Sequence, residues 1–129
     1  MPPRKVVLDT NFFLLPAQYN IDIFGGLLRV IEEPHQYVIS SRMLTELEQL
    51  AENHGKTGAE AKLGLKIYEL HKDKIEVVAS GMPVDSWIKK YAVENRAYVC
   101  TNDKELKNRL AKNGIRVIAR RGKNQVGFV

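Results

Sequence analysis

The sequence predicts an α/β fold of three layers, in which helices cover both faces of a central, mainly parallel sheet of four to five strands. Short apolar runs of strand type alternate with longer segments whose apolar residues recur at helical spacing. Two of the junctions from strand to helix end in an acid, Asp9 and Asp103. The 129 residues contain no linker or internal repeat, so we expect a single domain over residues 1–129.

The first half of the chain is expected to hold two strands and three helices. The strands are short runs rich in β-branched or aromatic residues, and the helices carry apolar residues three and four positions apart. Asp22 and Ser40-Ser41 offer caps at two helix starts, and Asn53-His54-Gly55 ends a helix. In chain order we expect a strand over 5–8, a helix over 21–31, a strand over 36–39 and helices over 41–52 and 57–71.

The second half continues the alternation. Pro83 opens a helix, because proline fits the first turn. Asn113-Gly114 stops the next helix, because both residues adopt the left-handed conformation at low cost. In chain order we expect a strand over 75–79, a helix over 83–95, a strand over 97–100, a helix over 103–112, a strand over 115–118 and a small strand over 126–129.

The net charge of +5 is unevenly placed along the chain. Eight basic residues lie between positions 104 and 123, where Glu105 is the only acid. A basic segment beside acidic residues indicates a polyanionic partner such as nucleic acid, although, taken alone, the segment is better explained as a solvated helix face with a basic tail. The nucleic-acid-binding residues that we expect are Lys104, Lys107, Arg116, Arg120, Arg121 and Lys123.

Several classes of protein are excluded by composition and missing motifs. No apolar run approaches ~18 residues, so no membrane span is expected. The single cysteine, Cys100, excludes an internal disulfide and fits a reducing compartment, so we expect a cytoplasmic protein. The glycine motifs of P-loop and dinucleotide-binding proteins are absent. A phosphotransferase with an aspartyl nucleophile would carry a second acid at position 11, which is Asn11.

The acids are expected to gather at one edge of the sheet. Asp9 and Asp103 follow two strands whose carboxyl ends meet where open α/β folds bind ligands, and Asp85 returns to that edge through one helix and one strand. Glu46 and Glu48 flank the buried stripe of their helix, and periodicity does not choose between them. Taken alone, Asp9, Asp85, Glu46 and Glu48 are better explained as cap or boundary residues, and Asp103 is explained equally well as a first-turn residue of a helix capped by the preceding asparagine. Together, without paired His or Cys, they favour Mg²⁺ or Mn²⁺ over zinc.

The same residues resemble the four-motif pattern of PIN-domain nucleases over essentially the whole chain. The matching segments are Leu8-Asp9-Thr10-Asn11, Glu46-Leu47, Asp85 and Thr101-Asn102-Asp103-Lys104-Glu105-Leu106-Lys107. The likeness is greater to the archaeal single-domain branch related to ribosomal-RNA-processing nucleases than to the toxin branch of toxin–antitoxin pairs. The resemblance implies a PIN-like fold and a Mg²⁺- or Mn²⁺-dependent ribonuclease that hydrolyses RNA phosphodiester bonds.

The resemblance also assigns roles to single residues. It implies that the catalytic and metal-binding acids are Asp9, Glu46, Asp85 and Asp103. Glu46 is selected over Glu48 because the acid of the family immediately precedes a leucine. Asn11 and Thr101 occupy positions where small polar residues orient the acids. Close relatives often have two adjacent acids at the third motif, whereas Asp85 is followed here by Ser86.

Two other functions remain open at this point. One is a catalytically weak or inactive PIN-like module that binds RNA or protein, and the other is a toxin-type ribonuclease. The partners expected are single-stranded or structured RNA, a processing complex or an antitoxin, and a second copy of the chain, because apolar residues exceed what a small core buries. Those residues are Met43, Leu63, Leu65, Ile67 and the pair Phe12-Phe13. Base stacking is the functional interpretation of Trp87, Tyr91 and Tyr98, and core packing is the favoured one for Trp87.

Overall fold

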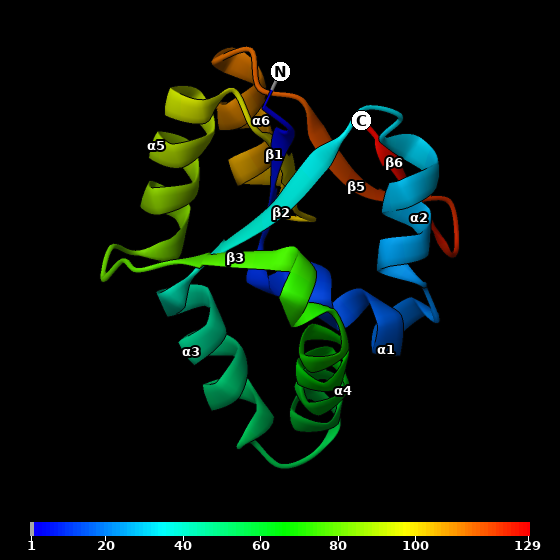
Figure 1. Ribbon diagram of the computed structural model, residues 1–129. Helices are drawn as coiled ribbons and strands as arrows, with labels where there is room; N and C mark the ends of the chain where they lie inside the picture. Colours follow the sequence, from blue (N-terminus) through cyan, green and yellow to red (C-terminus); the bar gives the residue numbers. More distant parts are fainter. Residues whose placement is uncertain (1) are drawn as a thin grey trace.

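The computed structural model describes residues 2–129 and contains, within that range, a six-stranded sheet in the order β3-β2-β1-β4-β5-β6 (Figure 1). The first five strands are parallel, and β6 runs antiparallel to β5. The predicted mainly parallel sheet is confirmed, and it has six strands in place of four to five, because the small strand expected in the tail pairs with β5. The strands are β1 (Arg4–Leu8), β2 (His35–Ser40), β3 (Ile75–Val78), β4 (Tyr98–Cys100), β5 (Val117–Arg121) and β6 (Gln125–Phe128).

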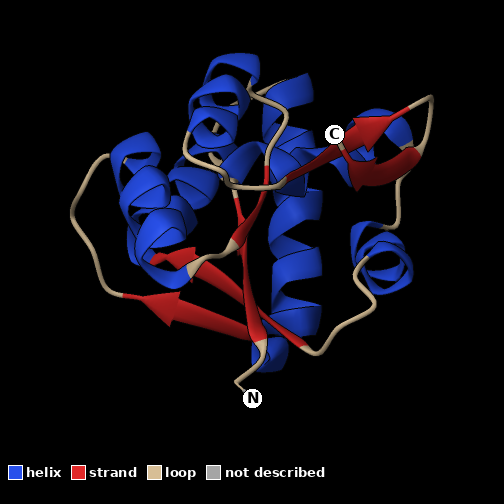
Figure 2. Ribbon diagram, turned by 90° about the horizontal axis from the view of Figure 1, so that it is seen from above, coloured by secondary structure: helices blue, strands red, loops and turns tan. Residues whose placement is uncertain are grey.

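Helices cover both faces of this sheet, as Figure 2 shows, and the predicted three-layer α/β arrangement is confirmed. The helix α5 packs against β1 and β4, α6 against β5, α3 against α4 and β2, and α2 against β6. The α-helices are α1 (Leu15–Tyr19), α2 (Ile23–Val30), α3 (Ser41–Ala51), α4 (Lys56–His71), α5 (Val84–Asn95) and α6 (Lys104–Lys112). Two short 3₁₀ helices are η1 (Thr10–Leu14) and η2 (Lys72–Lys74).

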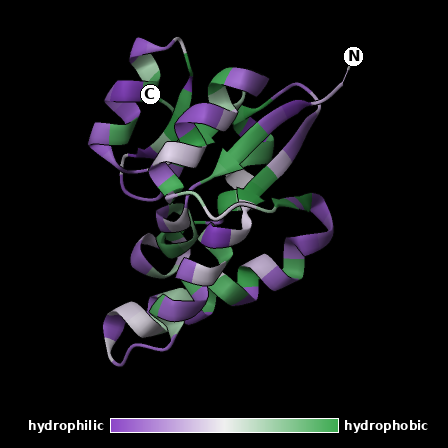
Figure 3. Ribbon diagram, turned by 90° about the vertical axis from the view of Figure 1, so that its left-hand side faces the viewer, coloured by the Kyte–Doolittle hydropathy of each residue, from purple (hydrophilic) through white to green (hydrophobic). Residues whose placement is uncertain are grey.

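The centre of the sheet is the most apolar part of the molecule, as the green strands of Figure 3 show. Val6, Val7 and Leu8 of β1 are fully buried, as are Val99 and Cys100 of β4. A parallel strand that is covered on both faces needs such a continuous apolar run, and each buried side chain contributes about 1.5–3 kcal/mol. The burial fixes β1 and β4 as neighbours, with Leu8 opposite Cys100.

The helix starts follow the predicted caps, with one correction. The Asp22 carboxylate accepts a hydrogen bond from the backbone of Gly25, and the Ser40 hydroxyl accepts one from Met43. At α6, however, the cap is Asp103 itself, whose carboxylate accepts from the backbone N–H of Leu106. The expected cap, Asn102, lies one residue too early, so Asp103 is the cap and not a first-turn residue.

Two segments differ from the sequence-based expectation for reasons of pairing and packing. The strand β5 begins at Val117 and continues to Arg121, because its second half forms a hairpin with β6 in which Arg121 pairs with Gln125. The segment after Asp9 forms η1 and then α1. Its aromatic residues Phe12 and Phe13 are buried.

The expected apolar excess is smaller than the composition indicates. Phe12, Phe13 and Met43 are buried within the single chain, so they do not support a homodimer. Leu63 on α4 is 40% exposed, and a second copy of the chain remains a prediction that rests on such residues. No helix in residues 2–129 is both long and apolar enough to span a lipid bilayer.

Candidate active site

The candidate site lies where the strand order changes direction. From β1 the chain first adds β2 and β3 on one side, and later adds β4 and β5 on the other. Asp9 follows β1 and Thr101 follows β4, and the backbone N–H of Asp9 donates to the carbonyl of Cys100 at 2.9 Å. The crevice at such a switch point is where open α/β sheets bind their ligands.

Asp9 is held in one orientation by three donors. Its side chain is almost completely buried, with 5% of its surface exposed. Oδ1 accepts from the backbone N–H of Thr10 at 2.8 Å, and Oδ2 accepts from Thr101 Oγ1 at 2.7 Å and from Asn11 Nδ2 at 3.2 Å. Asn11 and Thr101, the two residues expected to orient the acids, therefore both contact Asp9.

The electrostatics of Asp9 favour a cation beside it. The pKa of Asp9 is raised to about 6, chiefly by burial and to a smaller extent by the negative charges of Asp85 and Asp103, while hydrogen bonds from Thr101 and Thr10 lower it. Within residues 2–129, no lysine or arginine forms an ion pair with Asp9, Asp85 or Asp103. A buried carboxylate with like charges nearby and no counter-ion is costly, and a bound cation would remove that cost.

The other acids reach the same place from three helices. Asp103 begins α6, and its backbone N–H donates to Thr101 Oγ1 at 3.1 Å, so one hydroxyl connects Asp103 with Asp9. Asp85 lies in the first turn of α5 and is exposed. Glu46 lies on α3, with one oxygen 3.9 Å from the Nε of Arg42.

These four acids line one hollow of about 440 Å³, which we call the acidic pocket. Its remaining lining includes Thr10, Asn11 and Leu50 of α3. Glu48 is exposed and does not line the acidic pocket, so the geometry favours Glu46, as the resemblance implied. Ser86 is also exposed and does not line it.

The acidic pocket fits a hard divalent cation in donor chemistry. Its charged donors are carboxylate oxygens, and Thr10 Oγ1 is a buried hydroxyl without a hydrogen-bond partner among the described residues. As the side chains lie, no three His, Cys, Asp or Glu residues of the described chain are close enough to hold one ion together. A shared coordination shell therefore requires a rearrangement of the acids that line the acidic pocket.

Three of the predicted basic residues lie next to the acidic pocket. Lys104, Lys107 and Arg120 line a second hollow of about 330 Å³, the basic groove, together with Tyr19. Asn102 connects the two hollows, because its backbone N–H donates to Asn11 Oδ1 at 3.2 Å and its own Oδ1 accepts from the backbone N–H of Arg120 at 3.0 Å.

Tyr19 was not foreseen as a site residue. Its ring is 41% exposed, and the Arg120 guanidinium carbon lies 3.9 Å from the ring centroid. The signal in the sequence is weak: a tyrosine stands at the end of a short helix, before Asn20, whose φ of 55° turns the chain.

The other predicted nucleic-acid contacts are scattered. Arg121, at the end of β5, lines a separate hollow beside α2, and Lys123 is exposed in the hairpin turn. Arg116 precedes β5 and so lies at the opposite edge of the sheet. Tyr98 begins β4 and lies at that opposite edge too. Trp87 is buried and stacks on Tyr91 at 4.7 Å, in keeping with core packing.

Comparison with curated proteins identifies relatives along most of the chain. A family profile described as a PIN like domain matches residues 6–123. The chain is 31% identical over 113 residues to the rRNA-processing protein fcf1 of Schizosaccharomyces pombe, a match that covers 86% of this chain and 55% of that protein. It is 33% identical over 121 residues to Ribonuclease VapC4 of Methanocaldococcus jannaschii, covering 92% of each. The chain thus spans about half the length of the first relative and nearly all of the second.

Solved structures agree with these relatives. The PIN domain endonuclease Utp24 superposes with a TM-score of 0.80 at 28% identity, over 99% of this chain and 92% of that one. A domain of a functionally unknown protein from Methanocaldococcus jannaschii gives a TM-score of 0.65 at 22% identity, over 95% and 94% of the two chains, and supports the fold alone. The profile match, the two curated relatives and the topology lead to one conclusion: this chain belongs to the PIN-like domain family.

Proposed function

We propose that this protein is a divalent-metal-dependent ribonuclease that hydrolyses RNA phosphodiester bonds at the acidic pocket. The observation that carries the proposal is the convergence of four carboxylates on one hollow at the topological switch point, around the buried Asp9. Nuclease names among the relatives, Ribonuclease VapC4 and the endonuclease Utp24, support the class of reaction. The name of the relative fcf1 supports a role in RNA processing. The location that we propose is the cytoplasm, because the single free cysteine, Cys100, fits a reducing compartment.

Each residue of the acidic pocket has a distinct task in this proposal. The ligands of Mg²⁺ or Mn²⁺ are Asp9, Asp103, Glu46 and Asp85. When bound, such an ion supplies charge neutralisation and Lewis-acid activation of the phosphate and the attacking water. Thr101 and Asn11 fix Oδ2 of Asp9, and the backbone of Thr10 fixes Oδ1, so the central ligand needs no reorganisation during the reaction.

The basic groove provides a path for the RNA strand. Lys104, Lys107 and Arg120 attract phosphate groups next to the acids, which gives binding that weakens as salt is raised. The ring of Tyr19 is partly exposed, and the surface that the Arg120 guanidinium leaves uncovered allows an unpaired base to stack. This combination of positive charge and one aromatic surface favours single-stranded RNA at the acidic pocket.

Cleavage assays with two isosteric variants test the catalytic part. We expect wild-type protein to cleave RNA with Mg²⁺ or Mn²⁺ and to stop when the ions are chelated. Asp9→Asn and Asp103→Asn should each lower the rate on the order of a thousandfold, because a lost metal ligand removes several kcal/mol of charge stabilisation. Equal rates for wild-type protein and purified Asp9→Asn would refute the assignment.

Calorimetry with Mn²⁺ separates the ribonuclease from a binding module of the same fold. The module is favoured by one observation, that the described acids do not form a closed group around one point. We expect wild-type protein to bind Mn²⁺. The Asp9→Asn variant should bind Mn²⁺ at least tenfold more weakly, because changes to the groups around a metal ion commonly cost about 10- to 100-fold in affinity. Wild-type protein that binds RNA but not Mn²⁺ would identify the module. A toxin-type ribonuclease would additionally be inhibited by a protein partner.

A further inference from the structure

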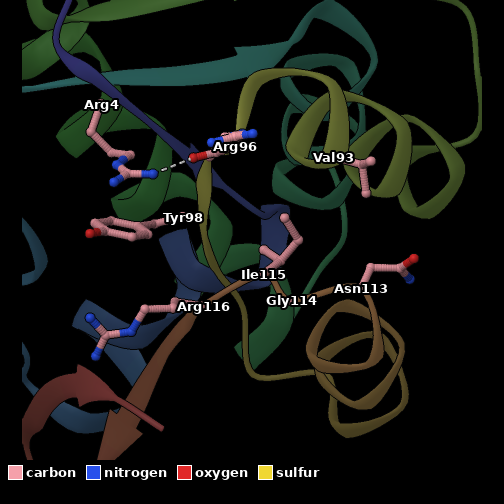
Figure 4. Close-up of a pocket in the computed structure, with 9 residues that line it drawn as sticks. Arg4, Val93, Arg96, Tyr98, Asn113, Gly114, Ile115 and Arg116 are labelled. Carbon is pink, nitrogen blue, oxygen red and sulfur yellow. Dashed lines mark hydrogen bonds between the residues drawn. The ribbon is translucent and has the colours of Figure 1, made fainter. Parts of the chain in front are cut away.

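The edge of the sheet opposite the acidic pocket carries a cluster of arginines. Arg4 opens β1 and Arg116 precedes β5, so both lie where neighbouring parallel strands begin, and Arg96 ends α5 in the left-handed conformation with φ of 51°. These three residues line a hollow of about 430 Å³, the arginine pocket, shown in Figure 4. No acidic residue is among the nine that line it.

Two of the arginines are held by stacking on aromatic rings. The Arg4 guanidinium carbon lies 4.6 Å from the centroid of the Tyr98 ring. That of Arg116 lies 3.9 Å from the Phe128 ring and 6.0 Å from the Tyr98 ring. In Figure 4 the Tyr98 ring lies between the two guanidinium groups. Such contacts fix the direction of side chains that would otherwise be mobile, and they use the flat face of the guanidinium.

The N–H groups at the edges of two of these arginines are available to a ligand. Arg4 is partly used, because Nη1 donates to the carbonyl of Arg96 at 2.8 Å and Nε lies 3.5 Å from Glu33. Arg96 and Arg116 are exposed, and their side chains make no hydrogen bond or ion pair to any other residue in the range 2–129. Their donors therefore face water in the free protein.

We propose that the arginine pocket is a second nucleic-acid-binding site, which holds backbone phosphates of a part of the RNA that is not being cut. The guanidinium fork matches phosphate oxygens in geometry and charge, and the lining contains no acid that would repel them. The identity of the polyanion as RNA rests on the proposed function, whereas the site itself rests on the arrangement of the arginines.

The distance between the two edges makes the site selective for longer RNA. The five residues of β1 separate the arginine pocket from Asp9, a span of roughly 16 Å for a strand. An RNA bound at the acidic pocket must pass around the molecule, or fold back, to reach Arg116. A short oligonucleotide is therefore bound only at the acidic edge, and a longer or structured RNA contacts both edges.

A double variant of the full chain, Arg96→Gln with Arg116→Gln, tests the site by RNA binding alone. Fluorescence anisotropy with a labelled RNA, in a chelating buffer that prevents cleavage, gives the affinity over a range of salt. For a long RNA we expect affinity about tenfold lower and a log–log salt dependence shallower by about 1.4, since each single-strand phosphate contact contributes about 0.7. For a short oligonucleotide we expect no change.

A matched variant controls for total charge. Lys62→Gln with Lys66→Gln removes two exposed positive charges from α4, which packs against α3, α1 and η1, and neither lysine lines the arginine pocket or the basic groove. We expect its affinity for the long RNA to stay within about twofold of wild type, because neither lysine belongs to a proposed phosphate-binding surface. Equal losses in the two double variants, or no loss in the arginine variant, would overturn the proposal.

The outcome is distinguishable from failure of the proposed function. Cleavage of a short RNA depends on Asp9 and Asp103, so the arginine variant should cleave it at the wild-type rate. If the wild-type protein cleaves no RNA but the arginine variant loses affinity for long RNA, the second site is supported and the ribonuclease proposal is refuted. If the wild-type protein cleaves RNA and the arginine variant keeps its affinity for long RNA, the ribonuclease proposal is supported and the second site is refuted.

Discussion

The two edges of the sheet treat charge in opposite ways. At the edge where β1 and β4 end, burial and neighbouring acids raise the pKa of Asp9 to about 6. At the edge where they begin, a hydrogen bond from the Tyr98 hydroxyl, assisted by the charge of Arg4, holds the pKa of Glu33 below its usual value. The ionised form of Asp9 is therefore destabilised in the metal-free protein, whereas the ionised form of Glu33 is already stabilised by Tyr98 and Arg4.

This difference follows from the parallel topology and supports the edge that we propose for the reaction. The starts of the parallel strands β1 to β5 lie on one side and their ends on the other, so residues placed at the two ends of such a strand never meet. The compensated edge gains little from a cation, because Arg4 and Tyr98 already satisfy Glu33. The uncompensated edge gains much, which is the physical reason to place the metal ion and the chemistry at Asp9.

The largest expected effect concerns stability without metal. Asp9→Asn should raise the free energy of unfolding at neutral pH by about 2–3 kcal/mol, because the shift of the Asp9 pKa from 3.8 to about 6 is the cost of its buried charge. Chemical denaturation of both proteins in chelator measures this difference. Glu48→Gln, at an exposed position outside the acidic pocket, serves as the control and should change stability by less than about 0.5 kcal/mol.

The pH dependence gives this prediction its sign. Between pH 3.8 and about 6 the unfolded chain has released the Asp9 proton while the folded chain keeps it, so the contribution of Asp9 to stability falls as pH rises through this window. The difference between wild type and Asp9→Asn should therefore be absent near pH 3.8 and complete above about pH 6. A stabilisation that is independent of pH would contradict this origin.

The next effect separates two glutamates on one helix. Glu46 lines the acidic pocket and Glu48 does not, although they are two residues apart on α3. We expect Glu46→Gln to lower metal-dependent cleavage by about 10- to 100-fold, as for groups that tune a metal site, and Glu48→Gln to leave it within about twofold. Rates measured at saturating Mn²⁺ check this, and equal rates for the two variants would remove Glu46 from the site.

The sequence predicts the acidic edge better than the rest because topology alone determines it. Asp9 and Asp103 follow strands whose apolar runs are unmistakable, and parallel pairing then brings both to one edge. Glu46 needs more, since helical periodicity places it and Glu48 symmetrically about the buried stripe. Only the packing of α3 beside η1 decides which of the two faces the pocket.

The proposed nucleic-acid-binding residues are less predictable, because the positions of charges along the chain do not show where those charges lie in space. Arg116 and Arg120 are four residues apart, but β5 carries them to opposite edges of the sheet. Arg4 and Tyr19 lie far from the basic segment in sequence and join it only in space. A count of charges contains no information on which edge a residue reaches, so one predicted track becomes the basic groove and the arginine pocket.

A smaller effect is expected from the hydroxyl that connects two acids. Thr101→Val removes the donor to Asp9 and the acceptor of the Asp103 N–H, which should lower stability by about 1–2 kcal/mol. It should also raise the pKa of Asp9 further, so that the acidic limb of the cleavage–pH profile moves upward. Thr101→Ser keeps the hydroxyl and should show the wild-type cleavage–pH profile. The same upward shift of the profile in both variants would indicate that Thr101 acts through its packing and not through its hydroxyl.

The smallest effect is expected at the compensated edge and tests whether the two edges are independent. Tyr98→Phe removes the hydroxyl that bonds to Glu33 but keeps the ring on which Arg4 stacks. Because the Glu33 side chain is 42% exposed, water replaces the lost partner, and we expect a loss of stability of only about 0.5–1 kcal/mol. The rate of short-RNA cleavage should not change, because Tyr98 lies at the start of β4 and the acidic pocket lies at the opposite end of that strand. A cleavage rate that falls tenfold would show that β4 couples the two edges, and the separation of binding from chemistry would then be wrong.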